Sequence, residues 1–148
     1  MTEMRIVMNE FLPASGSDDV WEDLVVSILA VNQYSLEKTY AFVGGLREAG
    51  LASPQNLGAW EIDRIVSRLK FAGCDRGDFM TPLFAARLAS LGKVIGARGI
   101  SVCAEILAGN DLEEIRRLLL PINGIGPKVL RNFCLLRGID SPPRLDTE

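Results

Sequence analysis

The chain has 148 residues, 48% of them hydrophobic and 24% charged, which is enough for one domain with a sizeable core. It contains no histidine, so mechanisms that need a histidine base or a histidine metal ligand are excluded. The formal net charge of −3 argues against non-specific nucleic-acid binding as the main role.

Apolar residues recur at helical spacing along the whole chain, and the alternating pattern of strands is absent. We therefore predict an all-α fold, a compact bundle or barrel of seven or eight short helices. Residues 1–17 are expected to be an N-terminal extension and 18–148 a single helical domain. The predicted helices, with approximate bounds, cover residues 18–31, 35–49, 54 onward, 60–72, 78–97, 101–108, 111–120 and 127–137.

Several residues are expected to begin or end these helices. Ser17 or Asp18 is the predicted N-cap of the first helix. Pro82 is expected in the first turn of the 78–97 helix, because a proline deeper inside would break it. The other predicted N-caps are Ser35, Ser53 and Asp111, and Gly138 is predicted to close the last helix. The aromatic residues expected in the core are Trp21, Trp60, Phe71, Phe84 and Phe133.

The three cysteines, Cys74, Cys103 and Cys134, are far apart in the chain and lie in apolar surroundings. No Cys-x-x-Cys pair exists from which a local zinc or iron–sulfur site could be built. We expect buried free thiols and neither a metal nor another cofactor.

The most distinctive stretch is residues 122–128, Ile-Asn-Gly-Ile-Gly-Pro-Lys, which joins two predicted helices. Glycine adopts the backbone angles of such a turn without steric cost. The first N–H groups of the following helix would form an anion site that the helix dipole supports. The expected phosphate-binding residues are Gly124, Ile125, Gly126, Lys128 and Val129. On the Gly-x-Gly turn alone, a plain helix–helix connection is equally compatible.

The distribution of charge favours the phosphate interpretation. Residues 115–139 contain five basic residues and no acidic ones, whereas the first 23 residues contain six acidic residues and one arginine. The positive charge therefore gathers in the sequence around the Gly-x-Gly turn, where a phosphate backbone would require it.

Residues 124–129, Gly-Ile-Gly-Pro-Lys-Val, resemble the helix–hairpin–helix of the endonuclease III-like (HhH-GPD) DNA glycosylases. Leu-Asp-Thr at 145–147 resembles the aspartate loop of that superfamily in residue type and in spacing from Lys128. Residues 21–32 resemble its first barrel helix, so the similarity covers about residues 20–147. The resemblance implies a hairpin over about 111–138 and a catalytic aspartate loop over 139–148.

The resemblance also implies base-excision repair by a DNA glycosylase with associated AP lyase activity, acting on double-stranded DNA that contains a damaged base or an abasic site. Lys128 would attack the sugar and form a Schiff base, and Asp146 would stabilise the cation-like sugar. Arg131, one turn along the same helix, would be a neighbouring cation and a possible DNA contact. Asn32, where the family usually has glutamine, and Gln33 are further possible DNA contacts, although a helix C-cap is as good a reading of Asn32.

The chain also departs from the family. Asn123 stands where a proline is usual, and the C-terminal helices and iron–sulfur loop of the family are missing after Asp146. The chain would then be a fragment, or a protein that has lost that half. Simpler interpretations remain for both residues. Lys128 would be a solvated lysine or a phosphate contact, and Asp146 would be a residue of the C-terminal tail.

Two alternative functions stay open: a non-catalytic or truncated helix–hairpin–helix module that binds DNA, and a helical protein-interaction domain whose hairpin is only a turn. No apolar run reaches transmembrane length and the N-terminus lacks the features of a signal peptide. We therefore expect a cytoplasmic, nucleoid-associated protein with no membrane partner. The lesion, the opposite base and the oligomeric state are left open.

Overall fold

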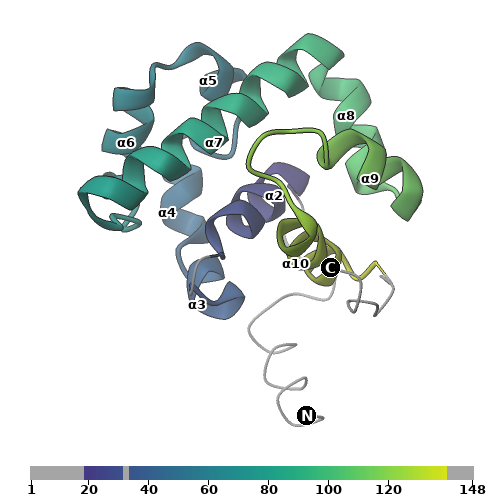
Figure 1. Ribbon diagram of the computed structural model, residues 1–148, viewed down its shortest axis with the longest axis horizontal. Coiled ribbons are helices and arrows are strands. Elements are labelled where there is room, and N and C mark those ends of the chain that lie inside the picture. The colour runs from purple at the N-terminus through teal and green to yellow at the C-terminus, as the bar shows by residue number, and fades with distance from the viewer. Residues whose placement is uncertain (1–18, 32–33, 140–148) are drawn as a thin grey trace, which may run out of the picture.

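The computed structural model describes residues 19–31 and 34–139, and every regular element in these ranges is an α-helix (Figure 1). The all-α prediction is confirmed. In chain order the helices are α2 (Val20–Leu29), α3 (Leu36–Tyr40), α4 (Val43–Glu48), α5 (Pro54–Ala59), α6 (Ile62–Phe71), α7 (Gly77–Arg98), α8 (Ile100–Ala108), α9 (Leu112–Leu119) and α10 (Pro127–Arg137).

Local capping explains where many of these helices begin. The side chains of Ser35, Ser53 and Asp111 each accept a hydrogen bond from the backbone N–H three residues further on, at 3.1, 3.2 and 3.3 Å, as predicted. The cap of α2 was predicted one or two residues too early: Asp19 accepts from the N–H of Trp21 at 2.9 Å. Gly138 ends α10 in the left-handed region, with φ +70°.

The segment 35–49 was predicted as one helix and is two. The N–H of Phe42 bonds to the carbonyl of Thr39 at 3.0 Å and closes a turn between α3 and α4. Past this turn, a Cβ placed on Gly45 would lie 2.8 Å from the backbone oxygen of Ala72. The chain therefore changes direction where the backbone of α4 approaches the end of α6 more closely than a side chain would allow.

The prediction for Pro82 was wrong, because α7 begins at Gly77 and continues past this proline to Arg98. Pro82 cannot donate a hydrogen bond to the carbonyl of Asp78. Both residues are exposed, so water can satisfy that carbonyl and the helix tolerates the loss.

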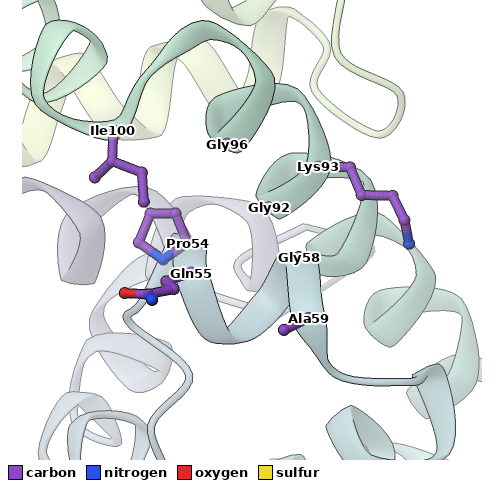
Figure 2. A pocket seen from close by; sticks show the side chains of 8 residues that line it. All are labelled: Pro54, Gln55, Gly58, Ala59, Gly92, Lys93, Gly96 and Ile100. Atoms are coloured by element: carbon purple, nitrogen blue, oxygen red, sulfur yellow. The ribbon is translucent and has the colours of Figure 1, made fainter.

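Helix α7 is the longest of the described helices (Figure 1): α5 and α6 pack along it, and α2 also contacts it and pairs with α10. The crossing of α5 and α7 depends on two glycines that face each other (Figure 2). A Cβ on Gly92 would collide with the backbone nitrogen of Gly58, and a Cβ on Gly58 would lie 3.0 Å from the oxygen of Gly92. The two backbones are therefore in direct contact, and a shallow groove of about 390 Å³ runs beside the crossing.

The core gathers apolar residues from all the helices. Phe84, Phe133 and Trp21 are buried in it, as predicted, and Trp60 is partly buried. Phe71 is 65% exposed, so its assignment to the core was wrong; the buried face of α6 runs through Ile65 and Leu69 instead. All three cysteines are buried and free, and burial raises the pKa of each thiol.

Candidate nucleic-acid interface

The predicted hairpin forms between α9 and α10. Two buried isoleucines hold its connection: Ile122 donates its N–H to the carbonyl of Leu119 at 2.9 Å, and Ile125 donates to the carbonyl of Ile122 at 3.0 Å. These consecutive turns reverse the chain within a few residues and leave Asn123 exposed between them. The connection is therefore anchored by two buried apolar side chains and by two turn hydrogen bonds.

Gly124 is required by both backbone conformation and space. Its φ is +95°, a region that side-chain-bearing residues rarely adopt. A Cβ here would also lie 2.6 Å from Cγ and 2.9 Å from Cδ of Arg87 on α7. The aliphatic part of Arg87 thus packs directly on the glycine, and this brings a cation from α7 to the hairpin.

The start of α10 has no capping side chain. Its N-cap, Gly126, has no side chain to accept from the first turn, and Pro127 occupies the first helical position. Among the described residues, nothing accepts a hydrogen bond from the backbone N–H of Gly126, Lys128 or Val129. The first turn contains no acidic residue, so the positive end of the helix is not neutralised locally.

A shallow hollow of about 410 Å³ lies at this helix start. Its lining brings together all five residues that the sequence suggested for phosphate binding, in the run 124–129, and adds Val31 and Arg87. Ile125 and Val129 have buried side chains, so only their backbone can serve a ligand. Arg87 and Lys128 are the charged residues of the lining, and no carboxylate is among them. The hollow therefore suits an anion.

The structure describes only part of the predicted catalytic and DNA-contact set. The Lys128 side chain is exposed at the rim of the hollow, without a hydrogen bond or ion pair to any described residue. Arg131 lies on the exposed side of α10 and does not line the hollow. Asn32, Gln33 and Asp146 lie outside the described residues.

Arg87 is the residue that sequence reasoning missed. It stands among the apolar residues of α7, between the buried Phe84 and Leu88. In the sequence it resembles any solvated arginine of an amphipathic helix. Only the contact with Gly124 in the folded protein identifies Arg87 as part of the hollow. No residue near Arg87 in the sequence indicates that Gly124 is its neighbour.

Asn132 joins the hairpin side of α10 to α2. Its Nδ2 donates to the carbonyl of Ala30 at 3.0 Å and to that of Ser27 at 3.3 Å. These are the carbonyl groups that the end of a helix leaves without intrahelical partners. The buried amide therefore fixes the end of α2, and with it Val31, against the helix that carries Lys128.

Arg137, one of the five basic residues at 115–139, forms an ion pair inside the protein and is not directed at the hollow. Arg137, at the far end of α10, donates from Nη1 to Oδ2 of Asp23 at 2.7 Å, and the Asp23 side chain is fully buried. Glu22 pairs in turn with Arg47. Burial raises the pKa of the nearby Tyr40 hydroxyl, and the charges of Asp23 and Glu22 add to that effect. Arg137 therefore stabilises the fold and adds no charge to the hollow.

An arginine–aromatic cluster extends from the hairpin. The Arg87 guanidinium lies 5.6 Å from the ring centre of Phe84. Arg76 lies 5.3 Å from the same ring and 3.6 Å from the ring centre of Tyr34. Rings and guanidinium groups thus alternate from Gly124 to the exposed Tyr34.

In the described ranges, no three cysteine, aspartate or glutamate side chains converge as potential metal ligands. Nor does any helix in those ranges have the length and apolar character needed to cross a membrane. Compared with family models, with curated proteins and with solved structures, the chain gives no match.

Proposed function

We propose that this chain acts on DNA in base-excision repair, as a DNA glycosylase with associated lyase activity and with Lys128 as its nucleophile. One observation carries the proposal: the hollow at the start of α10 combines three backbone N–H donors that have no partner among the described residues with two cations and no carboxylate.

A DNA phosphate is the anion that suits this hollow best. Helix starts bind phosphate through outward N–H groups and the helix dipole, and a glycine at position 126 leaves the backbone accessible, with no atom within 4 Å of a Cβ placed there. Arg87 and Lys128 would add charge on either side of the turn. Binding through the backbone is independent of base sequence, as expected for a protein that searches DNA for rare lesions.

The resemblance to endonuclease III-like enzymes supplies the chemistry. The Lys128 amine attacks C1′ of the deoxyribose, and the glycosidic bond breaks with its electron pair leaving on the base. The attacking nitrogen loses a proton, the C1′–O4′ bond then opens with a proton taken up at O4′, and an iminium forms between C1′ and the lysine nitrogen. The iminium loses a proton from C2′, the 3′ phosphate departs by β-elimination, and water hydrolyses the iminium and releases the enzyme. Asp146 would stabilise the positive charge on the sugar.

Borohydride trapping tests this mechanism, because it reduces the iminium to a stable amine. Duplexes would contain an abasic site, an oxidised pyrimidine, oxidised guanine or mismatched uracil. We expect a covalent adduct that Lys128→Ala abolishes and that Lys93→Ala preserves. Lys93 is a suitable control because it is an exposed lysine beside the α5–α7 groove. An adduct that persists in Lys128→Ala would reject Lys128 as the nucleophile.

A non-catalytic DNA-binding module is the second candidate, and the exposure of Lys128 favours it, since no described residue orients the amine. This candidate predicts salt-sensitive duplex binding, weakened by Lys128→Glu, with no adduct on any duplex. If Lys128→Glu leaves duplex binding unchanged, or the wild type does not bind, the hairpin is only a turn and both candidates fail.

A further inference from the structure

A second pocket, of about 340 Å³, lies between α3 and the connection from α6 to α7. Its lining includes two aromatic residues, Tyr34 and Phe42, and two cations, Lys38 and Arg76. Asp75 is the one carboxylate among the lining residues. None of these residues belongs to the hairpin hollow.

Arg76 is a half-buried cation with no carboxylate partner among the described residues. One of its N–H groups donates to the carbonyl of Leu29. A guanidinium has five donors in all, and no other hydrogen bond from this group reaches a described residue. Burial lowers the pKa of Arg76, because desolvation disfavours the charged guanidinium.

The two aromatic rings are fixed and still accessible. Phe42 lies against Gly73, where a Cβ would be 3.0 Å from two of its ring carbons. Tyr34 meets the edge of Phe84, with ring centres 6.4 Å apart. Phe42 nevertheless remains 41% exposed and Tyr34 36% exposed. The Arg76 guanidinium covers one face of Tyr34, at 3.6 Å from the ring centre, so a flat ligand would stack on Phe42 and on the opposite face of Tyr34.

The Asp75 carboxylate accepts hydrogen bonds within the turn that carries Arg76. Its Oδ1 accepts from the N–H of Gly77 at 3.1 Å and from the hydroxyl of Thr81 at 3.2 Å. The Thr81 hydroxyl oxygen accepts from the N–H of Arg76 at 2.7 Å. These bonds hold the backbone of Arg76. The Asp75 carboxylate keeps its negative charge, since its donors are neutral, and the two cations Lys38 and Arg76 outnumber it in the lining.

We propose that this pocket binds an unpaired nucleotide of a DNA strand, with the base against Tyr34 and Phe42 and the phosphate on Arg76 and Lys38. A flat base and an attached phosphate match rings and cations in one pocket, whereas an acidic peptide would use the cations alone. The choice of DNA as ligand rests on the proposed function. The arginine–aromatic cluster through Phe84 and Arg87 places the pocket next to the hairpin.

The test is fluorescence anisotropy with a labelled short oligothymidylate and, separately, a fully paired duplex, both at low salt. We expect Arg76→Gln, Lys38→Gln and Phe42→Leu each to weaken oligothymidylate binding by about ten-fold. Duplex binding should change by less than about two-fold in these variants, because the hairpin provides that contact. Lys128→Glu should instead weaken duplex binding and change oligothymidylate binding by less than about two-fold.

Matched controls come from residues that do not line the pocket. Arg64 lies 4.6 Å from the ring centre of Trp60, and Phe79 is 79% exposed; neither lines the pocket. Arg64→Gln and Phe79→Leu should leave both ligands unaffected. Lys38 is exposed, so Lys38→Gln keeps the test valid even if Arg76→Gln disturbs the fold.

The outcomes separate the two proposals. Oligothymidylate binding that the pocket variants weaken supports this inference, whether or not the duplex binds. If the duplex does not bind, the proposed function fails and this inference stands. Duplex binding without oligothymidylate binding, or oligothymidylate binding that no pocket variant weakens, overturns this inference and leaves the proposed function standing. Displacement of the oligothymidylate by polyglutamate at matched charge would show a site for anions in general and would also overturn it. If neither DNA binds, both proposals fail.

Discussion

The two ends of α10 use positive charge in opposite ways. At the first turn, Lys128 is exposed and the backbone N–H groups face a hollow that contains no carboxylate. At the last turn, Arg137 is largely buried and paired with the fully buried Asp23. A count of charges along the sequence treats both residues alike, but only the first turn presents its charge to a ligand. Charge near a motif therefore indicates binding only where the fold leaves that charge without an internal partner.

The largest expected effect is at the C-terminal end of α10. Asp23→Ala leaves Arg137 partly buried without this carboxylate, so the free energy of unfolding should fall by about 3–5 kcal/mol, measured by urea denaturation. The double variant Asp23→Leu with Arg137→Met should recover part of that loss, because it removes both charges. A loss below about 1 kcal/mol in Asp23→Ala would mean that the pair behaves as a surface ion pair, and the contrast between the two ends would disappear.

A smaller effect is expected at the crossing that holds α7, the helix that brings Arg87 to the hairpin. Gly92→Ala places a methyl group on the backbone of α5 and should lower the free energy of unfolding by about 3 kcal/mol. Gly96→Ala, one turn along the same groove (Figure 2), meets no atom within 4 Å. It should be neutral or stabilise by up to about 1 kcal/mol, because alanine favours helix. Equal losses in the two variants would contradict the direct backbone contact.

At the hairpin end, Gly124→Ala should lower the free energy of unfolding by about 1–2 kcal/mol, because of its positive φ and the contact with Arg87. Gly126→Ala has a negative φ and free space around its Cβ, so its stability should stay within about 0.5 kcal/mol of the wild type. If a phosphate approaches the N–H of residue 126, Gly126→Ala should nevertheless weaken duplex binding. Unchanged duplex binding in Gly126→Ala would place the phosphate elsewhere.

The smallest effect concerns the turn beside the second pocket. The N–H of Gly77 holds the pKa of Asp75 below its usual value. The stabilisation is therefore complete above the unfolded pKa, near 3.9, and is lost as the pH falls through the folded pKa. Asp75→Asn should be slightly less stable than the wild type at pH 7, and the difference should vanish in strong acid. Carboxyl NMR titration measures the pKa directly; a value above 3.9 would contradict the turn geometry.

Features that depend on neighbouring residues could be predicted from the sequence. Ser35, Ser53 and Asp111 cap helices because their partners lie three residues away. The Gly-x-Gly connection also formed where the sequence placed it. Helix periodicity and local capping are sufficient for these elements.

Features set by tertiary contacts could not be predicted. Arg87 meets Gly124 only because α7 crosses the hairpin, and Arg137 meets Asp23 across 114 residues of sequence. Phe71 is apolar but lies where α6 ends at the surface. The sequence therefore indicated which residues could bind a phosphate, but it could not show which charges the fold would use internally.

The Asn132 amide also bears on the order in which the chain folds. Its two carbonyl partners, at the end of α2 and at the C-cap that follows, are 105 and 102 residues away in sequence. Helix α2 emerges first among the described helices during synthesis, yet the groups that cover its end arrive with α10. Contacts of such long sequence separation form late and slow the folding of a domain. In pulse-labelling hydrogen exchange, we therefore expect the amides of α2 and α10 to gain protection together, after those of α5, α6 and α7.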